Sequence, residues 1–147
     1  MLSAEEQEKY DKGIEAVDNG DTAYGLVYLE GLFETRPDPI LTSYYAVCLA
    51  KERRETEQAL ELCDEAMADD PGNSLHYLNL GRVYVAAGMK RKAIKAFRDG
   101  LLYGKNPLIS RELERIGWRD LPLFPSLGRE HPLNRVLGKI LYRLGLK

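Results

Sequence analysis

Residues 74–107 read SLHYLNLGRVYVAAGMKRKAIKAFRDGLLYGKNP, and this stretch carries the clearest fold signal in the chain. Counted from Ser74 as position 1, it has an aromatic residue at positions 4, 11 and 24, Leu-Gly at positions 7 and 8, and a small residue at positions 20 and 27. These positions hold Tyr77, Tyr84, Phe97, Leu80, Gly81, Ala93 and Gly100. The pattern predicts two helices joined by a turn at Gly88, with small residues where the helices cross closely.

The same spacing recurs upstream, in two preceding units of the same length, without a gap. Small residues and prolines again take matching positions: Gly13, Gly25 and Pro37 in residues 6–39, and Ala59, Ala66 and Pro71 in residues 40–73. The second unit departs from the pattern in its first helix, where Val47 takes position 8. The three units together cover 102 of the 147 residues.

This ladder resembles the tetratricopeptide repeat (TPR), a helix–turn–helix unit of about 34 residues. The resemblance implies an all-α fold, an α-solenoid of three TPR units within residues 1–107. It also implies a binding function rather than catalysis. Arrays of this family usually end in a capping helix that covers the last repeat. Asn106 and Pro107 read as the N-cap and first residue of such a helix, over about 107–116.

Residues 108–147 resemble no family beyond that capping helix. Their middle part, GWRDLPLFPSLGREHPL, contains three prolines and is predicted to be extended. A basic amphipathic helix is predicted over 132–144. Because so short a segment rarely forms a core of its own, we expect this tail to dock on the array, on a partner or on another copy, with Trp118 buried.

Charge is divided unevenly along the chain. Residues 1–73 hold 6 basic and 18 acidic residues, a net charge of −12, whereas residues 74–147 hold 15 and 5, a net charge of +10. Because a repeat array is nearly one-dimensional, halves of the sequence become halves of the molecule. This asymmetry favours contact between copies, or one partner with opposite charges at its two ends.

Nothing in the sequence indicates an enzyme, a cofactor or a metal site. The two histidines, His76 and His131, are far apart, and no glycine-rich phosphate loop is present. Cys48 and Cys63 lack CxxC spacing and are expected to be reduced core thiols. The acidic, polar start of the chain is unlike a secretory signal, so we expect a cytoplasmic protein.

The family resemblance also implies a binding groove, lined by positions 2, 5, 6, 9 and 12 of each repeat. The peptide-binding residues that it implies are Tyr10, Ile14, Val17, Leu41, Tyr44, Tyr45, Leu75, Leu78, Asn79, Arg82 and Val85. Gln7, Cys48 and Lys51 share these positions. The resulting surface would be exposed, apolar and aromatic, which requires a cover. A partner peptide or helix, the chain's own tail, or a second copy could provide it.

The groove positions of this sequence do not fit one ligand that the family is known to bind. Members that hold the acidic C-terminal tails of heat-shock chaperones carry lysine, asparagine and arginine at five groove positions. The corresponding residues here are Tyr10, Ile14, Tyr45, Leu75 and Asn79. The sequence therefore predicts a scaffold or adaptor for another protein partner. The alternative is an adaptor at nucleic acid or a membrane surface that uses the basic C-terminal helix.

Overall fold

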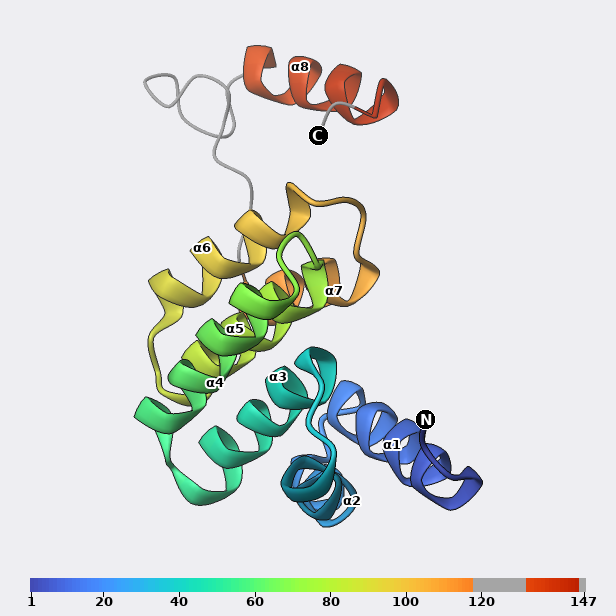
Figure 1. Ribbon diagram of the computed structural model, residues 1–147. Coiled ribbons are helices and arrows are strands. Elements are labelled where there is room, and N and C mark those ends of the chain that lie inside the picture. Colours follow the sequence, from blue (N-terminus) through green and yellow to red (C-terminus); the bar gives the residue numbers. More distant parts are fainter. Residues whose placement is uncertain (118–131, 146–147) are drawn as a thin grey trace. The chain divides into compact units, whose positions relative to one another are not determined.

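The computed structural model describes residues 1–117 and 132–145, and these residues form helices and no strand (Figure 1). Chain contacts divide the protein into two compact units, Met1–Ile116 and Gly117–Lys147. The predicted burial of Trp118 and the extended proline-rich segment lie outside the described residues. None of the described helices is long and apolar enough to cross a lipid bilayer.

The first unit contains three helix pairs followed by a further helix. The pairs are α1 (Ala4–Asp18) with α2 (Thr22–Thr35), α3 (Pro39–Cys48) with α4 (Thr56–Asp69), and α5 (Ser74–Ala86) with α6 (Lys90–Leu101). The helix α7 (Pro107–Arg115) packs on α6 and α5, so it covers the third pair. The predicted solenoid of three helix–turn–helix units with a capping helix is confirmed. In the second unit, α8 spans Pro132–Arg143.

Local sequence signals start most of these helices. Ser3 accepts a hydrogen bond from the Glu6 amide at 3.2 Å, and the Glu6 carboxylate accepts from the Ser3 amide at 2.8 Å, which makes the predicted capping box. Asn106 accepts from the amides of Leu108 and Ile109 at the start of α7, directly before a proline. These caps satisfy amides that would otherwise lack partners in the first helical turn.

Glycine at position 8 allows the two helices of a repeat to approach closely. A Cβ atom added to Gly81 would overlap the Phe97 ring, and one added to Gly13 would overlap Leu29. Phe97 and Leu29 both occupy position 24, so the same contact recurs in the first and third repeats. In the second repeat, position 8 holds the larger Val47 and position 24 holds the smaller Cys63, and both residues are buried. A larger residue on one helix is thus matched by a smaller one on the other.

The end of the third helix has a feature that the repeat pattern does not predict. The α-helix ends at Cys48 and continues as a π-helix, η1 (Leu49–Arg53), and the Arg54 amide donates to the Leu49 carbonyl. Arg54 takes the left-handed conformation, with φ of 59°. Gly20 and Gly88, one period away on either side, have φ of 87° and 74°. The backbone of this turn is therefore left-handed in all three repeats, although only two of them have glycine.

The core runs through the array and centres on α3. Every residue of α3 from Leu41 to Cys48 is buried, because α3 packs against α1, α2, α4 and α5. Helices α1, α3, α5 and α7 form a row in which each contacts the next. This row forms the face that carries the candidate site.

Candidate functional site

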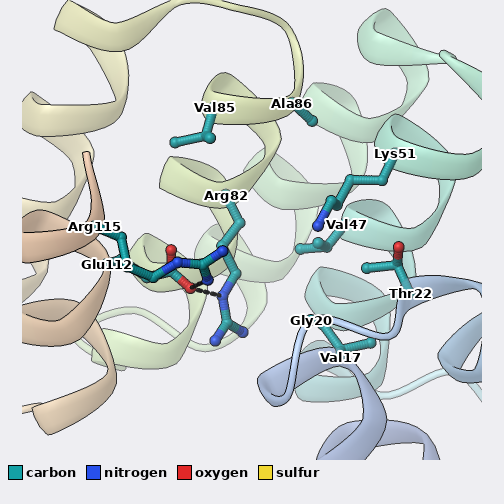
Figure 2. A pocket seen from close by; sticks show the side chains of 10 residues that line it. All are labelled: Val17, Gly20, Thr22, Val47, Lys51, Arg82, Val85, Ala86, Glu112 and Arg115. Atoms are coloured by element: carbon teal, nitrogen blue, oxygen red, sulfur yellow. Dashed lines mark hydrogen bonds and ion pairs between the residues drawn. The ribbon is translucent and has the colours of Figure 1, made fainter.

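A pocket lies where the C-terminal parts of α1, α3 and α5 approach α7 (Figure 2). Its empty volume is about 420 Å³, including the part open to solvent. Ten residues from all three repeats and α7 line it: Val17, Gly20, Thr22, Val47, Lys51, Arg82, Val85, Ala86, Glu112 and Arg115. Apolar side chains and three cationic ones thus share one small concave surface.

Arg82 is the central polar residue of this pocket. Its side chain is 6% exposed and projects from α5 between α7 and the end of α1. Its Nη1 donates to Asp18 Oδ1 at 2.8 Å, and its Nε donates to Glu112 Oε1 at 3.2 Å. Arg82 therefore joins the first helix of the first repeat to the capping helix. Charge-assisted bonds of this kind are stronger than neutral ones.

The polar network continues beneath the pocket. The Tyr44 hydroxyl donates to Asp18 Oδ1 at 3.0 Å, and Arg82 Nη1 also donates to Asn79 Oδ1 at 3.2 Å. Asn79 in turn donates to Ser43 Oγ at 3.0 Å. Burial, together with the nearby Asp18 carboxylate, raises the pKa of the Tyr44 hydroxyl above its ordinary value. Tyr44 therefore stays protonated and can donate to Asp18.

A branch of the same network reaches His76 on α5. The His76 ring is fully buried, with Nδ1 3.1 Å from Ser43 Oγ and Nε2 2.9 Å from Asp70 Oδ2. Hydrogen bonds from Asn73 and from His76 hold the pKa of Asp70 below its ordinary value. Because both ring nitrogens of His76 have protein partners, this histidine connects repeats and is not presented to a ligand.

The capping helix closes this end of the row. Arg111 Nη2 donates to the Asp18 carbonyl at 2.9 Å, across 93 residues of sequence. Arg115 Nη1 lies 3.5 Å from Glu112 Oε1, and its side chain is 62% exposed. The end of α1 and the capping helix are thus in direct contact rather than separated by an open groove.

The sequence predicted an exposed apolar groove, and for most of its residues this is wrong. Leu41, Tyr44, Tyr45, Leu78 and Asn79 are buried, as are Val17 and Arg82. The physical reason is that α3 packs against α1, α2, α4 and α5, while the bonds of Arg82 to Asp18 and Glu112 link α1, α5 and α7 beside it. Side chains that would face an open groove therefore pack against neighbouring helices.

The structure brings only part of the predicted set together. Val17, Arg82 and Val85 line the pocket, and Val85 is 39% exposed. Tyr44 and Arg82 both donate a hydrogen bond to Asp18 Oδ1. Tyr45 instead stacks on Phe33 of α2, with ring centroids 4.4 Å apart.

The other predicted residues lie away from the pocket. The Tyr10 hydroxyl bonds Asp38 at 3.3 Å, and Ile14 and Leu75 are half-buried. A binding role for all of these residues stays a prediction.

Several pocket residues were not among the predicted site residues. Glu112 and Arg115 belong to α7, and Gly20, Thr22, Val47 and Ala86 lie outside the groove positions of the family. One signal pointed to Glu112: it is one of only five acidic residues in the basic half of the chain. Of the two acidic residues on α7, Glu112 is buried and Glu114 is exposed, and a buried acidic residue can pair with a buried cation.

Comparisons with known proteins agree with this architecture. A family model described as "Tetratricopeptide repeat" matches residues 50–111. The Sgt2 TPR domain from Aspergillus fumigatus has a TM-score of 0.56 at 20% identity, covering 78% of each chain. The Arabidopsis OM64 TPR domain has a TM-score of 0.53 at 18% identity, covering 76% of this chain and 93% of that one.

A third similar structure contains a ligand. The second TPR domain of human RPAP3, in complex with an HSP70 peptide, has a TM-score of 0.51 at 19% identity, covering 76% of this chain and 93% of that one. No curated protein sequence matches the chain. The repeat ladder, the three helix pairs with their capping helix, and the family model over residues 50–111 together support a tetratricopeptide repeat architecture for the first unit.

Proposed function

We propose that this protein is a non-enzymatic scaffold or adaptor that binds a segment of a protein partner at the face formed by α1, α3, α5 and α7. The observation that carries the proposal is the pocket on that face, which combines apolar walls with cationic side chains. Pockets with mainly apolar walls and a few placed polar groups are typical of binding sites. Residues from three repeats and the capping helix contribute to it, so it depends on the assembled array.

The similar fold of RPAP3 supports peptides as the class of ligand, since that TPR domain holds an HSP70 peptide. We do not propose HSP70 as the partner of this chain. The five positions at which the chaperone-binding members of the family carry their cationic and amide groups hold other residues here. Asn79, which stands at one of them, is fully buried and bonded to Ser43 and Arg82.

Site-specific photo-crosslinking tests this proposal on the full-length protein. A photoreactive amino acid at Val85, which is exposed in the pocket, should crosslink a defined protein in a lysate of the source organism. The matched control places it at Val27 on α2, which is 75% exposed and outside the pocket. A synthetic peptide of the crosslinked segment should then bind the purified protein. Equal crosslinking from both positions, or binding unaffected by Val85→Glu, would contradict the proposal.

A second candidate function uses α8. Val136, Ile140 and Leu144 are exposed on or just after this helix, as are Lys139 and Arg143. An amphipathic helix with basic residues can lie on an anionic membrane or contact nucleic acid. Such binding should weaken steeply with salt, whereas binding in the pocket should change little. Co-sedimentation with anionic vesicles at low and high salt, for the parent and for Lys139→Gln with Arg143→Gln, separates the two.

We further propose a cytoplasmic location, which Cys48 and Cys63 support because both are free, buried thiols.

The opposite charges of the two halves of the chain also support self-association as a second use of its surface. Fluorescence microscopy of a tagged protein, and light scattering at increasing salt, test these two points separately.

A further inference from the structure

One nitrogen of the central arginine has no partner. Arg82 Nε and Nη1 each donate to a carboxylate, whereas Nη2 is buried without any hydrogen-bond partner. Buried polar groups in folded proteins are almost always paired, because an unpaired donor has lost its water without a replacement. An orphaned donor on a residue that lines a pocket points to a ligand that would satisfy it.

The other charged side chains of the pocket are also arranged for an anion. Lys51 and Arg115 line the pocket with Arg82, whereas Glu112 is the one carboxylate among the lining residues. Both Arg82 and Arg115 already share Glu112 Oε1. Two neighbouring carboxylates, Asp18 and Glu52, are engaged with Arg82 and with the Thr22 hydroxyl. Among the described residues, Lys51 has no ion-pair partner, so its ammonium group is the cation of this pocket that can meet an anion.

The remaining walls are apolar. Val17, Val47, Val85 and Ala86 line the pocket from α1, α3 and α5, and Figure 2 shows them around the Arg82 side chain. A ligand that fits both kinds of wall has an anionic group next to an aliphatic one. The planar guanidinium favours a carboxylate, which accepts two parallel N–H bonds.

We infer that this pocket binds a carboxylate of the partner segment, with an aliphatic side chain of the same segment against the valines. The inference rests on the proposed function and names the chemistry of the ligand at that site. Lys51 and Arg115 are exposed, so an incoming carboxylate contacts them before it reaches the buried Arg82. Arg82 Nη2 is buried, so its pairing with the carboxylate requires the side chains around it to move. These cations differ from those of the chaperone-binding members, because they stand at other repeat positions and on the capping helix.

Nuclear magnetic resonance titration of the full-length protein tests the inference with three short peptides. The first, N-acetyl-Gly-Asp-Leu-Gly-amide, carries an internal carboxylate beside an aliphatic residue. The second replaces its aspartate by asparagine, and the third, N-acetyl-Gly-Gly-Leu, ends in a free carboxylate. The acidic peptide should shift the amide signals of Gly20, Val85 and Ala86 and bind about tenfold more tightly than its asparagine counterpart.

Variants of Lys51 and Arg115 test the inference without altering the core, because both side chains are exposed. Lys51→Met with Arg115→Gln should weaken binding of the acidic peptide about tenfold. The matched control, Lys90→Met with Arg91→Gln, removes the same charge from exposed positions outside the pocket and should bind like the parent. Arg82→Lys keeps the charge but removes the unpaired Nη2, and it should also weaken binding if it folds with a normal circular dichroism spectrum.

Each outcome bears on one of the two proposals. Tighter binding of the free-acid peptide than of the internal one would support the inference and assign the carboxylate to a chain terminus. Equal binding of the aspartate and asparagine peptides would overturn the inference but leave the pocket as a peptide site. Sodium acetate or sulfate shifting the same signals with equal affinity would mean an adventitious ion only, and would overturn it. Absence of peptide binding, with crosslinking still specific for Val85, would overturn the inference alone; loss of both would overturn both proposals.

Discussion

Gly81 illustrates how one residue fixes the spacing of two helices. Its missing side chain leaves room for the ring of Phe97, which is completely buried. The first repeat has the same contact between Gly13 and Leu29. A glycine in a helix costs free energy relative to alanine, so its presence here is compensated by closer packing.

Replacing Gly81 by alanine should therefore destabilise the fold, although alanine is the better helix former. The added methyl group overlaps the Phe97 ring, and overpacking of this kind costs about 1–3 kcal/mol. Gly31→Ala is the matched control, since nothing lies within 4 Å of a Cβ at that helical position. It should raise the free energy of unfolding by about 0.5–1 kcal/mol. Urea denaturation measures both, and equal effects would contradict the packing argument.

The two thiols should be unreactive in the folded protein. Burial raises the pKa of Cys48 and of Cys63 from 9.0 to about 12. Because the unfolded chain ionises these thiols first, they lower the free energy of unfolding as the pH rises from about 9 towards 12. Labelling with a chromogenic disulfide at about pH 8 should be slow in buffer and immediate in urea. Labelling in buffer at the rate of an exposed cysteine would show that the core is open.

Within a repeat, the turn between helices depends on one backbone conformation. Gly20, Arg54 and Gly88 all have positive φ, and they stand at the same position of the three repeats. A side chain in this conformation costs roughly 1–2 kcal/mol, which glycine avoids. The second repeat bears this cost at Arg54, directly after the π-helix η1.

Arg54→Gly should therefore stabilise the protein, by about 0.5–1 kcal/mol after the greater freedom of glycine in the unfolded chain is counted. The control, Lys51→Gly, places glycine within η1, where glycine should be destabilising because it loses more freedom on folding. Thermal and urea unfolding measure both variants. A lower melting temperature for Arg54→Gly would mean that the Arg54 side chain contributes more than its strained backbone costs.

At the next helix boundary, Asn106 both caps α7 and ties it to α5. Its Oδ1 accepts from two amides of α7, and its Nδ2 donates to Ser74 Oγ at 3.0 Å. Asn106→Ala should lower the free energy of unfolding by about 1–2 kcal/mol. Asn106→Asp keeps the cap acceptor and loses only the bond to Ser74, so it should cost less. Hydrogen exchange in α7 should rise in the alanine variant, and unchanged exchange there would count against the capping role.

Across the whole first unit, Asp18 joins parts of the chain that are far apart in sequence. Its carboxylate accepts from Tyr44 and Arg82, and its carbonyl accepts from Arg111. These bonds span 26, 64 and 93 residues respectively. Repeat proteins are usually held by contacts between neighbouring repeats alone. Here the first repeat also contacts the third repeat and the capping helix.

Asp18→Ala should weaken this long-range connection. It leaves the Arg82 guanidinium buried with fewer partners, which should cost about 1–3 kcal/mol. Hydrogen exchange should increase in α1 and in α7 together, because Arg82, which also bonds Glu112 of α7, loses its partner on α1; the Arg111 bond to the Asp18 carbonyl remains. Glu15→Ala is the control, as Glu15 is an exposed residue of the same helix. An increase confined to α1 would show that Asp18 does not couple the two ends.

The helices and their pairing could be predicted from sequence signals alone. Position 8, position 24 and the prolines at position 32 specify local contacts within a single repeat, so the repeats could be found and aligned without coordinates. Capping signals at Ser3 and Asn106 likewise act only on the first turn of the helix that follows. The left-handed backbone of Arg54 and the π-helix before it were missed, because arginine gives no signal for a left-handed backbone.

Whether the inner face is an open groove could not be predicted in this way, because it depends on how the helices pack. Periodicity places Tyr44, Leu78 and Arg82 on one side of their helices, but it does not state how closely α1, α5 and α7 approach. That distance results from the packing of all the helices, within which Arg82 pairs with Asp18 and Glu112, 64 and 30 residues away in the sequence. Ion pairs over such separations form only when the array is assembled. For this reason the groove predicted from the repeat positions is largely filled, and the pocket lies at the junction with the capping helix.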